Sequence, residues 1–133
     1  MQKNRFILSL SMFLLLAAAC TKGPGVGGRA SIQGKVYAHN YSNSFLLNDS
    51  GYIGGEKVYI KYGDEPGVGD DVDTDNTGTF YFPYLRKGKY TVYVYSKRLV
   101  PNAIDSAVVQ TVSISDRTEE VELPQFNINT LKN

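Results

Sequence analysis

Carboxylates crowd one short segment of the chain, and oxygen ligands at such density could hold a cation. Residues 64–76 contain six of the thirteen acidic residues, among them Asp64, Asp70, Asp71, Asp73 and Asp75. Asp71, Asp73 and Asp75 repeat the one-three-five spacing that opens an EF-hand calcium loop. Asn76 stands where that loop requires Gly, and Phe82 stands where it requires Glu. The segment is a candidate Ca²⁺ site, with a solvated hairpin tip as the alternative, and no other cofactor is expected.

Tyrosine is the dominant aromatic residue, with ten in the chain and no tryptophan. Alternation of side chains along extended strands would point Tyr59, Tyr81, Tyr93 and Tyr95 away from a core. If the strands that carry Tyr59, Tyr93 and Tyr95 share a sheet, these three rings form an exposed aromatic strip. Such rings can stack on the faces of sugars or anchor a protein partner. The alternative is that they only pack against each other and stabilise the sheet.

Catalysis by acid–base or nucleophilic routes needs a titratable group held in a cleft, and the chain offers few candidates. His39 is the single histidine, and we expect it in a polar loop just after the first strand. No Ser-His-Asp set can be argued from its spacing, so a solvated histidine is the simpler interpretation. Cys20 is the single cysteine, which excludes disulfides within the chain and multi-cysteine metal sites. The sequence predicts a protein that is not an enzyme.

Cys20 has a different chemistry available, because it follows the three-part pattern of a secretory signal. Lys3 and Arg5 precede an apolar run over residues 6–19 that is shorter than the roughly 20 residues needed to span a bilayer. The stretch Leu-Ala-Ala-Ala-Cys that ends at Cys20 resembles the lipobox of bacterial lipoproteins, in which the cysteine is lipidated and becomes the first residue. An ordinary secretory cleavage site is the alternative. The resemblance implies a signal peptide over 1–19 and a lipid anchor on Cys20.

The expected location is therefore the envelope of a Gram-negative bacterium, with the protein anchored to the outer membrane on its periplasmic face or at the cell surface. Removal of residues 1–19 leaves 133 − 19 = 114 residues, enough for one domain. Lys3 and Arg5 leave with the signal, so 14 − 2 = 12 basic residues face 13 acidic ones, a formal charge of −1. A mildly acidic body without a basic stripe excludes nucleic acid as the expected partner. The partners expected are the membrane and an envelope protein or glycan.

The body of the chain has an apolar pattern of period two, which predicts strands and no amphipathic helix. Residues 20–30 are rich in glycine and predict a flexible tether after Cys20. Strands are predicted at 31–38, 56–62, 79–83, 89–96, 107–115 and 118–123. Short strands joined by turns favour an all-β sandwich, because both apolar faces must be covered.

Alternation along these strands also predicts the core, with Leu85 closing one end of the sandwich. The residues expected inside are Ile32, Val36, Val58, Ile60, Phe80, Phe82, Tyr90, Val92, Val94, Val108, Val112, Ile114, Val121 and Leu123.

One motif is specific: Thr74-Asp75-x-x-Gly78-x-Phe80-x-Phe82-x-x-Leu85-x-x-Gly88-x-Tyr90-x-Val92-x-Val94. Together with the segments before it, this order resembles the carboxypeptidase regulatory-like domain and its transthyretin-like and collagen-adhesin B-type relatives. The resemblance covers residues 31–123. It implies a seven-stranded antiparallel Greek-key sandwich that is non-catalytic and serves as a spacer, a stabilising appendage or a recognition module on envelope proteins.

Two segments depart from that pattern: a polar insertion over residues 41–53, and a tail over 124–133 that is either an added edge strand or a disordered end. Three functions follow as hypotheses. The first is a structural or protein-interaction module of the envelope. The second is a glycan-binding accessory lipoprotein that uses Tyr59, Tyr93 and Tyr95, and the third is a pilus- or adhesin-type subunit whose tail exchanges a strand.

Overall fold

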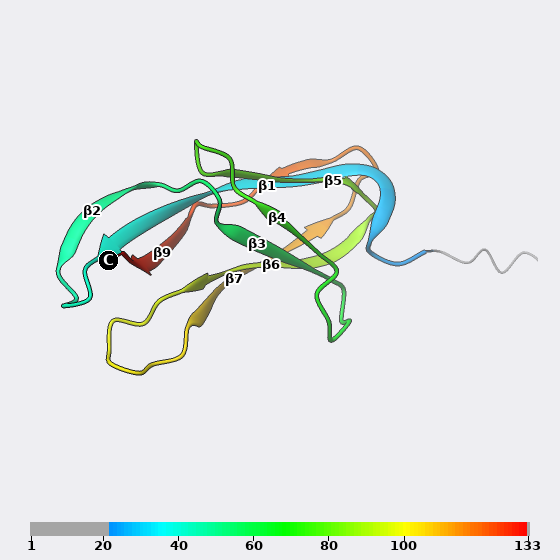
Figure 1. The fold of residues 1–133 in the computed structure, drawn as a ribbon. Helices are drawn as coiled ribbons and strands as arrows, with labels where there is room; N and C mark the ends of the chain where they lie inside the picture. Colours follow the sequence, from blue (N-terminus) through cyan, green and yellow to red (C-terminus); the bar gives the residue numbers. More distant parts are fainter. Residues whose placement is uncertain (1–21, 133) are drawn as a thin grey trace, which may run out of the picture.

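The computed structural model describes residues 22–132, which form nine strands in two sheets (Figure 1). The predicted signal peptide, 1–19, and Cys20 lie outside the described residues. The strands are β1 (Val26–Tyr41), β2 (Leu47–Tyr52), β3 (Lys57–Tyr62), β4 (Asp70–Asp73), β5 (Thr79–Leu85), β6 (Gly88–Ser96), β7 (Ser106–Ile114), β8 (Glu120–Glu122) and β9 (Phe126–Leu131). Across the part of the chain described, no helix has the length and hydropathy to cross a membrane. The all-β sandwich expected from the sequence is confirmed.

One sheet is organised around the long strand β1. The first half of β1 pairs with β5 in antiparallel and with β8 in parallel orientation. Its second half pairs with β2 in antiparallel and with β9 in parallel orientation. β1 therefore runs the length of the sandwich with a partner on each side, and it connects the two ends of the molecule.

The other sheet has the order β4-β3-β6-β7, and all of its pairs are antiparallel. β6 and β7 form a hairpin joined by the long loop at residues 97–105. The apolar faces of the two sheets meet in one core cluster that includes Ile32 of β1, Phe80 of β5 and Val92 of β6, all of them buried. At roughly 25 cal/mol per Å², the apolar area removed from water in such a core is the main favourable contribution to folding.

The predicted core is confirmed in most of its members. Val108, Val112 and Val121 are only partly buried and pack against the edge of the core, while the other predicted residues and Leu85 are buried. The structure adds Ala30, Ala38, Phe126 and Ile128 to the core. Ala30 belongs to the segment predicted as tether, and Phe126 and Ile128 belong to the tail, so the core extends past both predicted boundaries of the domain.

The tether is shorter than predicted, because β1 begins at Val26 and not at residue 31. The glycines of this segment serve close packing: a Cβ on Gly28 would lie 2.0 Å from the carbonyl oxygen of Leu85. The Arg86 guanidinium donates hydrogen bonds to the carbonyl oxygens of Gly23, at 2.7 Å, and of Val26. The Tyr90 hydroxyl accepts a hydrogen bond from the Gly25 N–H at 2.9 Å. The glycines thus allow two backbone segments to approach each other closely here.

The strand count is nine, whereas seven antiparallel strands were expected. The polar insertion supplies β2, and residues 70–73, expected in a loop, form the short edge strand β4. The tail forms β9, so of its two predicted states the added strand is confirmed. β8 and β9 run parallel to β1, which departs from the expected antiparallel arrangement.

The turn before β5 has the geometry that the motif predicts. The Asp75 carboxylate accepts hydrogen bonds from the Thr77 and Thr79 backbone N–H groups at 2.8 and 3.0 Å, and the Gly78 N–H donates to the Asp75 carbonyl oxygen at 2.9 Å. Gly78 has a φ of 76°, a conformation that side-chain-bearing residues rarely adopt. This turn sets the register with which Phe80 and Phe82 enter the core.

Candidate functional site

Three tyrosines gather on the outer face of the β4-β3-β6-β7 sheet, because β3 and β6 are neighbours in it. Tyr59 of β3 lies directly opposite Tyr93 of β6 in the strand register. Their ring centroids are 5.1 Å apart and their planes differ by 14°, a stacked pair. Both side chains are half-buried, because each covers part of the other. The alternation that sends Val58, Val92 and Val94 into the core thus sends these rings outward.

Tyr95 completes the cluster two residues further along β6. Its ring meets those of Tyr59 and Tyr93 edge-on, with centroid distances of 5.6 Å and interplanar angles of 73° and 83°. Tyr95 is 45% exposed and is the most accessible of the three rings. We call Tyr59, Tyr93 and Tyr95 the tyrosine face. Edge-to-face and stacked contacts of this kind fix ring orientation before any ligand arrives.

The Tyr93 hydroxyl stays protonated in neutral solution. Partial burial, and then the neighbouring hydroxyls of Tyr95 and Tyr59, raise the pKa of Tyr93 above its ordinary value. A protonated phenol both donates and accepts a hydrogen bond. Tyr93 therefore offers apolar ring surface together with a neutral hydroxyl group.

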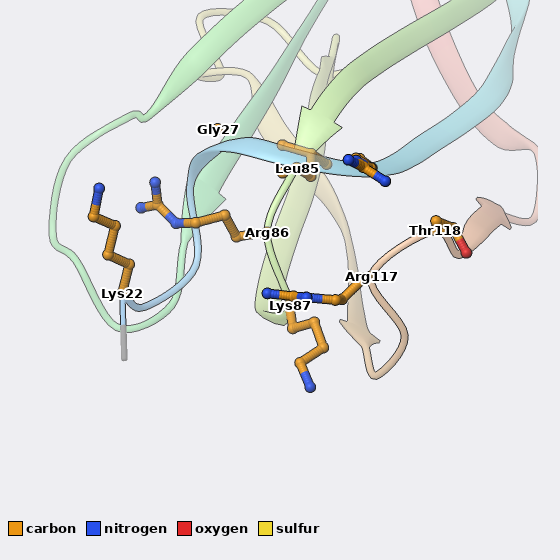
Figure 2. A pocket seen from close by; sticks show the side chains of 9 residues that line it. Lys22, Gly27, Leu85, Arg86, Lys87, Arg117 and Thr118 are labelled. Carbon is orange, nitrogen blue, oxygen red and sulfur yellow. The ribbon is translucent and has the colours of Figure 1, made fainter. Parts of the chain in front are cut away.

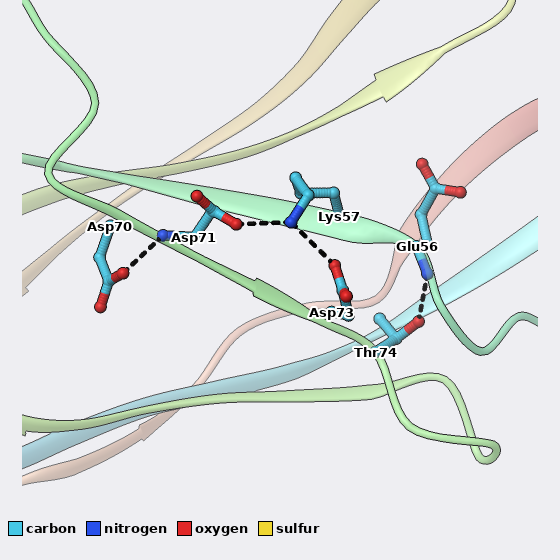
Figure 3. A network of polar contacts seen from close by, with 6 residues as sticks. All are labelled: Glu56, Lys57, Asp70, Asp71, Asp73 and Thr74. Atoms are coloured by element: carbon cyan, nitrogen blue, oxygen red, sulfur yellow. Dashed lines mark hydrogen bonds and ion pairs between the residues drawn. The ribbon is translucent and has the colours of Figure 1, made fainter.

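Charged groups border the tyrosine face on its β4 side. Figure 3 shows three of them, Lys57, Asp71 and Asp73. Asp71 lies opposite Tyr59 in the register, and Asp73 lies opposite Lys57. The Lys57 ammonium contacts the Asp71 carboxylate at 2.6 Å and the Asp73 carboxylate at 3.0 Å. The hydrogen bond to Asp71 has the largest effect in raising the pKa of Lys57 above its ordinary value, and the hydrogen bond to Asp73 has the next largest. Two carboxylates share one ammonium, so the border carries a net negative charge and open acceptor positions.

The end of β4 is tied down by a buried side chain. The Thr74 hydroxyl donates to the Ile53 carbonyl oxygen at 2.6 Å and accepts from the Glu56 N–H at 3.0 Å (Figure 3). These bonds hold the last residue before the Asp75 turn against the segment that leads into β3. Asp71 and Asp73 are therefore presented from a fixed edge strand.

Across β6 the face continues onto β7, where Val109 lies opposite Tyr93 and is 53% exposed. Asp71, Tyr59, Tyr93 and Val109 thus form one row across four strands, with a charged end and an apolar end. An arrangement of this kind can hold an amphipathic ligand, with its apolar surface on the rings and its hydroxyls at the carboxylates.

The predicted calcium ligands are not brought together. Asp71 and Asp73 bind Lys57, Asp75 caps its own turn, and Asp70 accepts a hydrogen bond from the Asp71 N–H at 2.8 Å. Asp64 lies in the turn after β3, beyond the end of the strand pair opposite to Asp73. Within residues 22–132 no three or more His, Cys, Asp or Glu side chains are grouped as metal ligands would be. Asp70, Asp71, Asp73 and Asp75 act here as partners of Lys57 or of backbone N–H groups.

No family model matches the chain, and no curated protein does. Among solved structures, the chain is similar to a Pseudomonas aeruginosa protein whose crystal structure is described as that of "a putative carbohydrate binding protein". The two share 17% sequence identity with a TM-score of 0.40, over 84% of this chain and 93% of the other. The relation to the carboxypeptidase regulatory-like domain remains a prediction from the motif.

A second aromatic group, which the sequence analysis missed, lies on the outer face of the other sheet. Tyr37 and Tyr52 meet edge-on at 5.3 Å, and the Lys35 ammonium lies 4.9 Å from the centre of the Tyr52 ring. His39 was expected in a loop, but it lies within β1 with its Nδ1 2.8 Å from the Ser50 hydroxyl. The alternation of Lys35, Tyr37 and His39 would have indicated a longer strand and a shared outer face.

Proposed function

We propose that this protein is a non-catalytic, lipid-anchored accessory protein of the cell envelope that binds a glycan on its tyrosine face. The observation that carries the proposal is the contiguous cluster of Tyr59, Tyr93 and Tyr95 bordered by Asp71 and Asp73. Glycans combine apolar C–H faces with dense hydroxyl groups. The tyrosine face combines apolar ring surface with carboxylate acceptors on the neighbouring strand, β4.

The shape of the surface suits an extended ligand. The row from Asp71 to Val109 crosses all four strands of the sheet, and neighbouring strands lie roughly 4.8 Å apart. A surface of this width accommodates more than one sugar residue. We therefore infer that the ligand is an oligosaccharide or polysaccharide segment and not a free monosaccharide.

The anchor belongs to the same proposal. The lipobox resemblance at Cys20 and the hydrogen bonds that hold Gly23 and Gly25 against the sandwich support a domain near a membrane. An accessory protein in that position would retain glycan at the envelope for other proteins to process. We infer a non-catalytic role from the sequence, which offers no acid–base or nucleophilic set. His39 contacts the Ser50 hydroxyl on the neighbouring strand β2.

The strand-exchange hypothesis receives less support than the glycan hypothesis. Phe126 and Ile128 of β9 are fully buried in the chain's own core. The outer edge of β9 is also occupied at Asn129, because the Lys97 N–H donates to the Asn129 carbonyl oxygen and the Asn129 N–H donates to the Ser96 hydroxyl, both at 2.9 Å. β9 would have to leave the core of its own domain before it could pair with a strand of a neighbouring molecule.

A glycan array, followed by calorimetric titration with any bound oligosaccharide, tests the proposal. Tyr95→Ala should lower glycan affinity by about tenfold, since truncation of an interface aromatic commonly costs more than 1 kcal/mol. Tyr81→Ala is the matched control, because Tyr81 is 49% exposed on β5 of the other sheet. Equal binding by the wild type, Tyr95→Ala and Tyr81→Ala would leave the tyrosines with a purely stabilising role.

A further inference from the structure

A second surface of different chemistry lies at the end of the sandwich where the described chain begins. A pocket of about 790 Å³ opens between the start of β1, the β5–β6 turn and the loop after β7 (Figure 2). Its floor includes Gly27, Gly28 and Leu85. Its charged lining residues are Lys22, Arg29, Arg86, Lys87 and Arg117. Five cations from three separate chain segments thus line one end of a chain whose described body is otherwise of mixed charge.

The carboxylates near this pocket offset only part of its positive charge: Asp116 and Glu119 lie in the loop that carries Arg117, and Glu65 and Arg86 both lie close enough to Tyr62 to act on it. Hydrogen bonds from the Thr118 N–H and hydroxyl lower the pKa of Asp116, and the charge of Lys87 contributes to the same shift. The Glu119 carboxylate accepts hydrogen bonds from the Ser115 and Asp116 N–H groups at 2.7 and 3.1 Å. Both acids are thus held within their own loop, and no Asp or Glu lines the pocket among the described residues.

The pocket lies close in the sequence to the predicted anchor. Lys22, which lines it, stands two residues after Cys20 in the sequence. The Arg86 guanidinium and the Tyr90 hydroxyl bind the backbone of residues 23–26 against the same end of the sandwich. A lipid on Cys20 would therefore bring this end, and not another, to the membrane surface.

We infer that the four exposed cations at this end, Lys22, Arg29, Lys87 and Arg117, bind the anionic phosphate headgroups of the membrane to which Cys20 is tethered, while Arg86 holds the start of β1. The inference rests on the lipid anchor of the proposed function, and it is independent of the glycan. Each Lys or Arg near an anionic bilayer surface strengthens binding about fivefold. Membrane anchoring commonly combines a lipid with a basic patch, so the two devices would act together at one end of the domain.

Docking in this way fixes the orientation of the tyrosine face. β6 runs from Gly88, beside Lys87 at the pocket, to Ser96 at the far end. Tyr93 and Tyr95 lie in the distal half of that strand. With its basic end on the headgroups, the sandwich would present these rings away from the bilayer, where an envelope glycan can reach them.

The test uses the chain from Cys20 onward with Cys20→Ser, so that no lipid can be attached; all nine strands lie in the retained residues. Co-sedimentation is measured with phosphatidylcholine vesicles and with vesicles of equal parts phosphatidylcholine and phosphatidylglycerol. The variant Lys87→Glu/Arg117→Glu is compared with Arg98→Glu/Lys132→Glu, which reverses two exposed cations beyond β6 and β9, at the opposite end. Thermal melting confirms that both variants are folded.

We expect the protein to bind the vesicles that contain phosphatidylglycerol and not those of phosphatidylcholine alone, and we expect added salt to weaken this binding. The vesicle affinity of Lys87→Glu/Arg117→Glu should be at least about 25-fold lower than that of the matched variant. Equal binding to both vesicles, or equal loss in both variants, would overturn the inference. Saturable binding of inorganic phosphate without vesicle binding would assign the pocket to a soluble anion and would also overturn it. Tyr95→Ala should leave vesicle binding unchanged, which separates this result from the fate of the glycan proposal.

Discussion

The ring of Tyr59 stacks on the ring of Tyr93 across the β3–β6 pair, with centroids 5.1 Å apart and planes 14° from parallel. The two residues are direct register partners, so the contact is a consequence of how the strands pair. Tyr95 meets both rings edge-on and is held by them. A binding surface whose rings are already fixed loses less conformational entropy when a ligand binds.

The stacked pair should be measurable as a coupling in stability. A double-mutant cycle with Tyr59→Ala, Tyr93→Ala and the double variant, followed by urea unfolding, should give a coupling free energy of about 0.5–1.5 kcal/mol. The physical reason is that the second truncation removes a ring that has already lost its stacking partner. Strictly additive effects would show that the rings lie side by side without interacting.

The Tyr90 hydroxyl should stabilise the start of β1. It accepts from the Gly25 N–H at 2.9 Å and donates to the Arg86 carbonyl oxygen at 2.7 Å. Tyr90→Phe leaves the buried Gly25 N–H without that acceptor, which should cost about 1–3 kcal/mol in urea unfolding. Tyr62→Phe is the control, because the half-buried Tyr62 ring contacts Tyr90 but its hydroxyl makes no hydrogen bond to the described residues. A loss of equal size in both variants would contradict the assignment.

The tail should be essential to the fold. Phe126 is fully buried and packs edge-on against Phe80 at 5.8 Å. Phe126→Ala should lower the free energy of unfolding by about 3–5 kcal/mol, because it removes a large buried ring and leaves a cavity. Asn127→Ala, at the exposed neighbouring position, should change it by less than about 0.5 kcal/mol. Similar stability of Phe126→Ala and wild type would mean that β9 is dispensable.

The Asp75 turn should make stability fall in acid. Hydrogen bonds from the Thr77 hydroxyl and from the Thr79 and Thr77 backbone N–H groups lower the pKa of Asp75 below its ordinary 3.8. A carboxyl whose pKa is lower in the folded state contributes stability above its unfolded pKa and loses it as pH falls through its folded pKa. Asp75→Asn cannot ionise. The melting temperatures of wild type and Asp75→Asn should therefore differ most above about pH 5 and converge below about pH 2; a constant difference would contradict this.

Local periodicity was sufficient to predict the central strands and the face that each presents. Val58 and Ile60, and Val92 and Val94, are buried where period-two alternation places them, and the tyrosines between them point outward. The same rule predicted that Tyr59, Tyr93 and Tyr95 point outward, whereas their common surface depends on the pairing of β3 with β6. Alternation is a property of each strand by itself, and so it can be read without knowledge of pairing.

Pairing between distant segments could not be read in the same way. β9 joins β1 through residues 90 positions apart, such as Val36 and Phe126, and no local pattern specifies that partnership or its parallel direction. Gly28 was interpreted as part of a flexible tether because glycine serves both flexible chain and close backbone contact. Only the position of the Leu85 carbonyl oxygen distinguishes the two roles.

Acidic spacing was the least informative signal. Asp71 and Asp73 are two residues apart on a strand, which places them on one face, where Lys57 contacts both carboxylates. In a loop, the same spacing could have surrounded a cation. Because residues 70–73 form a strand, Asp71 and Asp73 contact Lys57 and form a charged border beside the tyrosine face.

The most direct test of the central claim is the affinity of the protein for an oligosaccharide identified on a glycan array, compared between wild type and the Tyr93→Ala/Tyr95→Ala double variant. Both proteins are first shown to be folded by thermal melting. The double variant should bind at least about tenfold more weakly, since it lacks the exposed ring and half of the stack that holds it. Equal affinity of the two folded proteins, or binding of no glycan by the wild type, would contradict the proposed function.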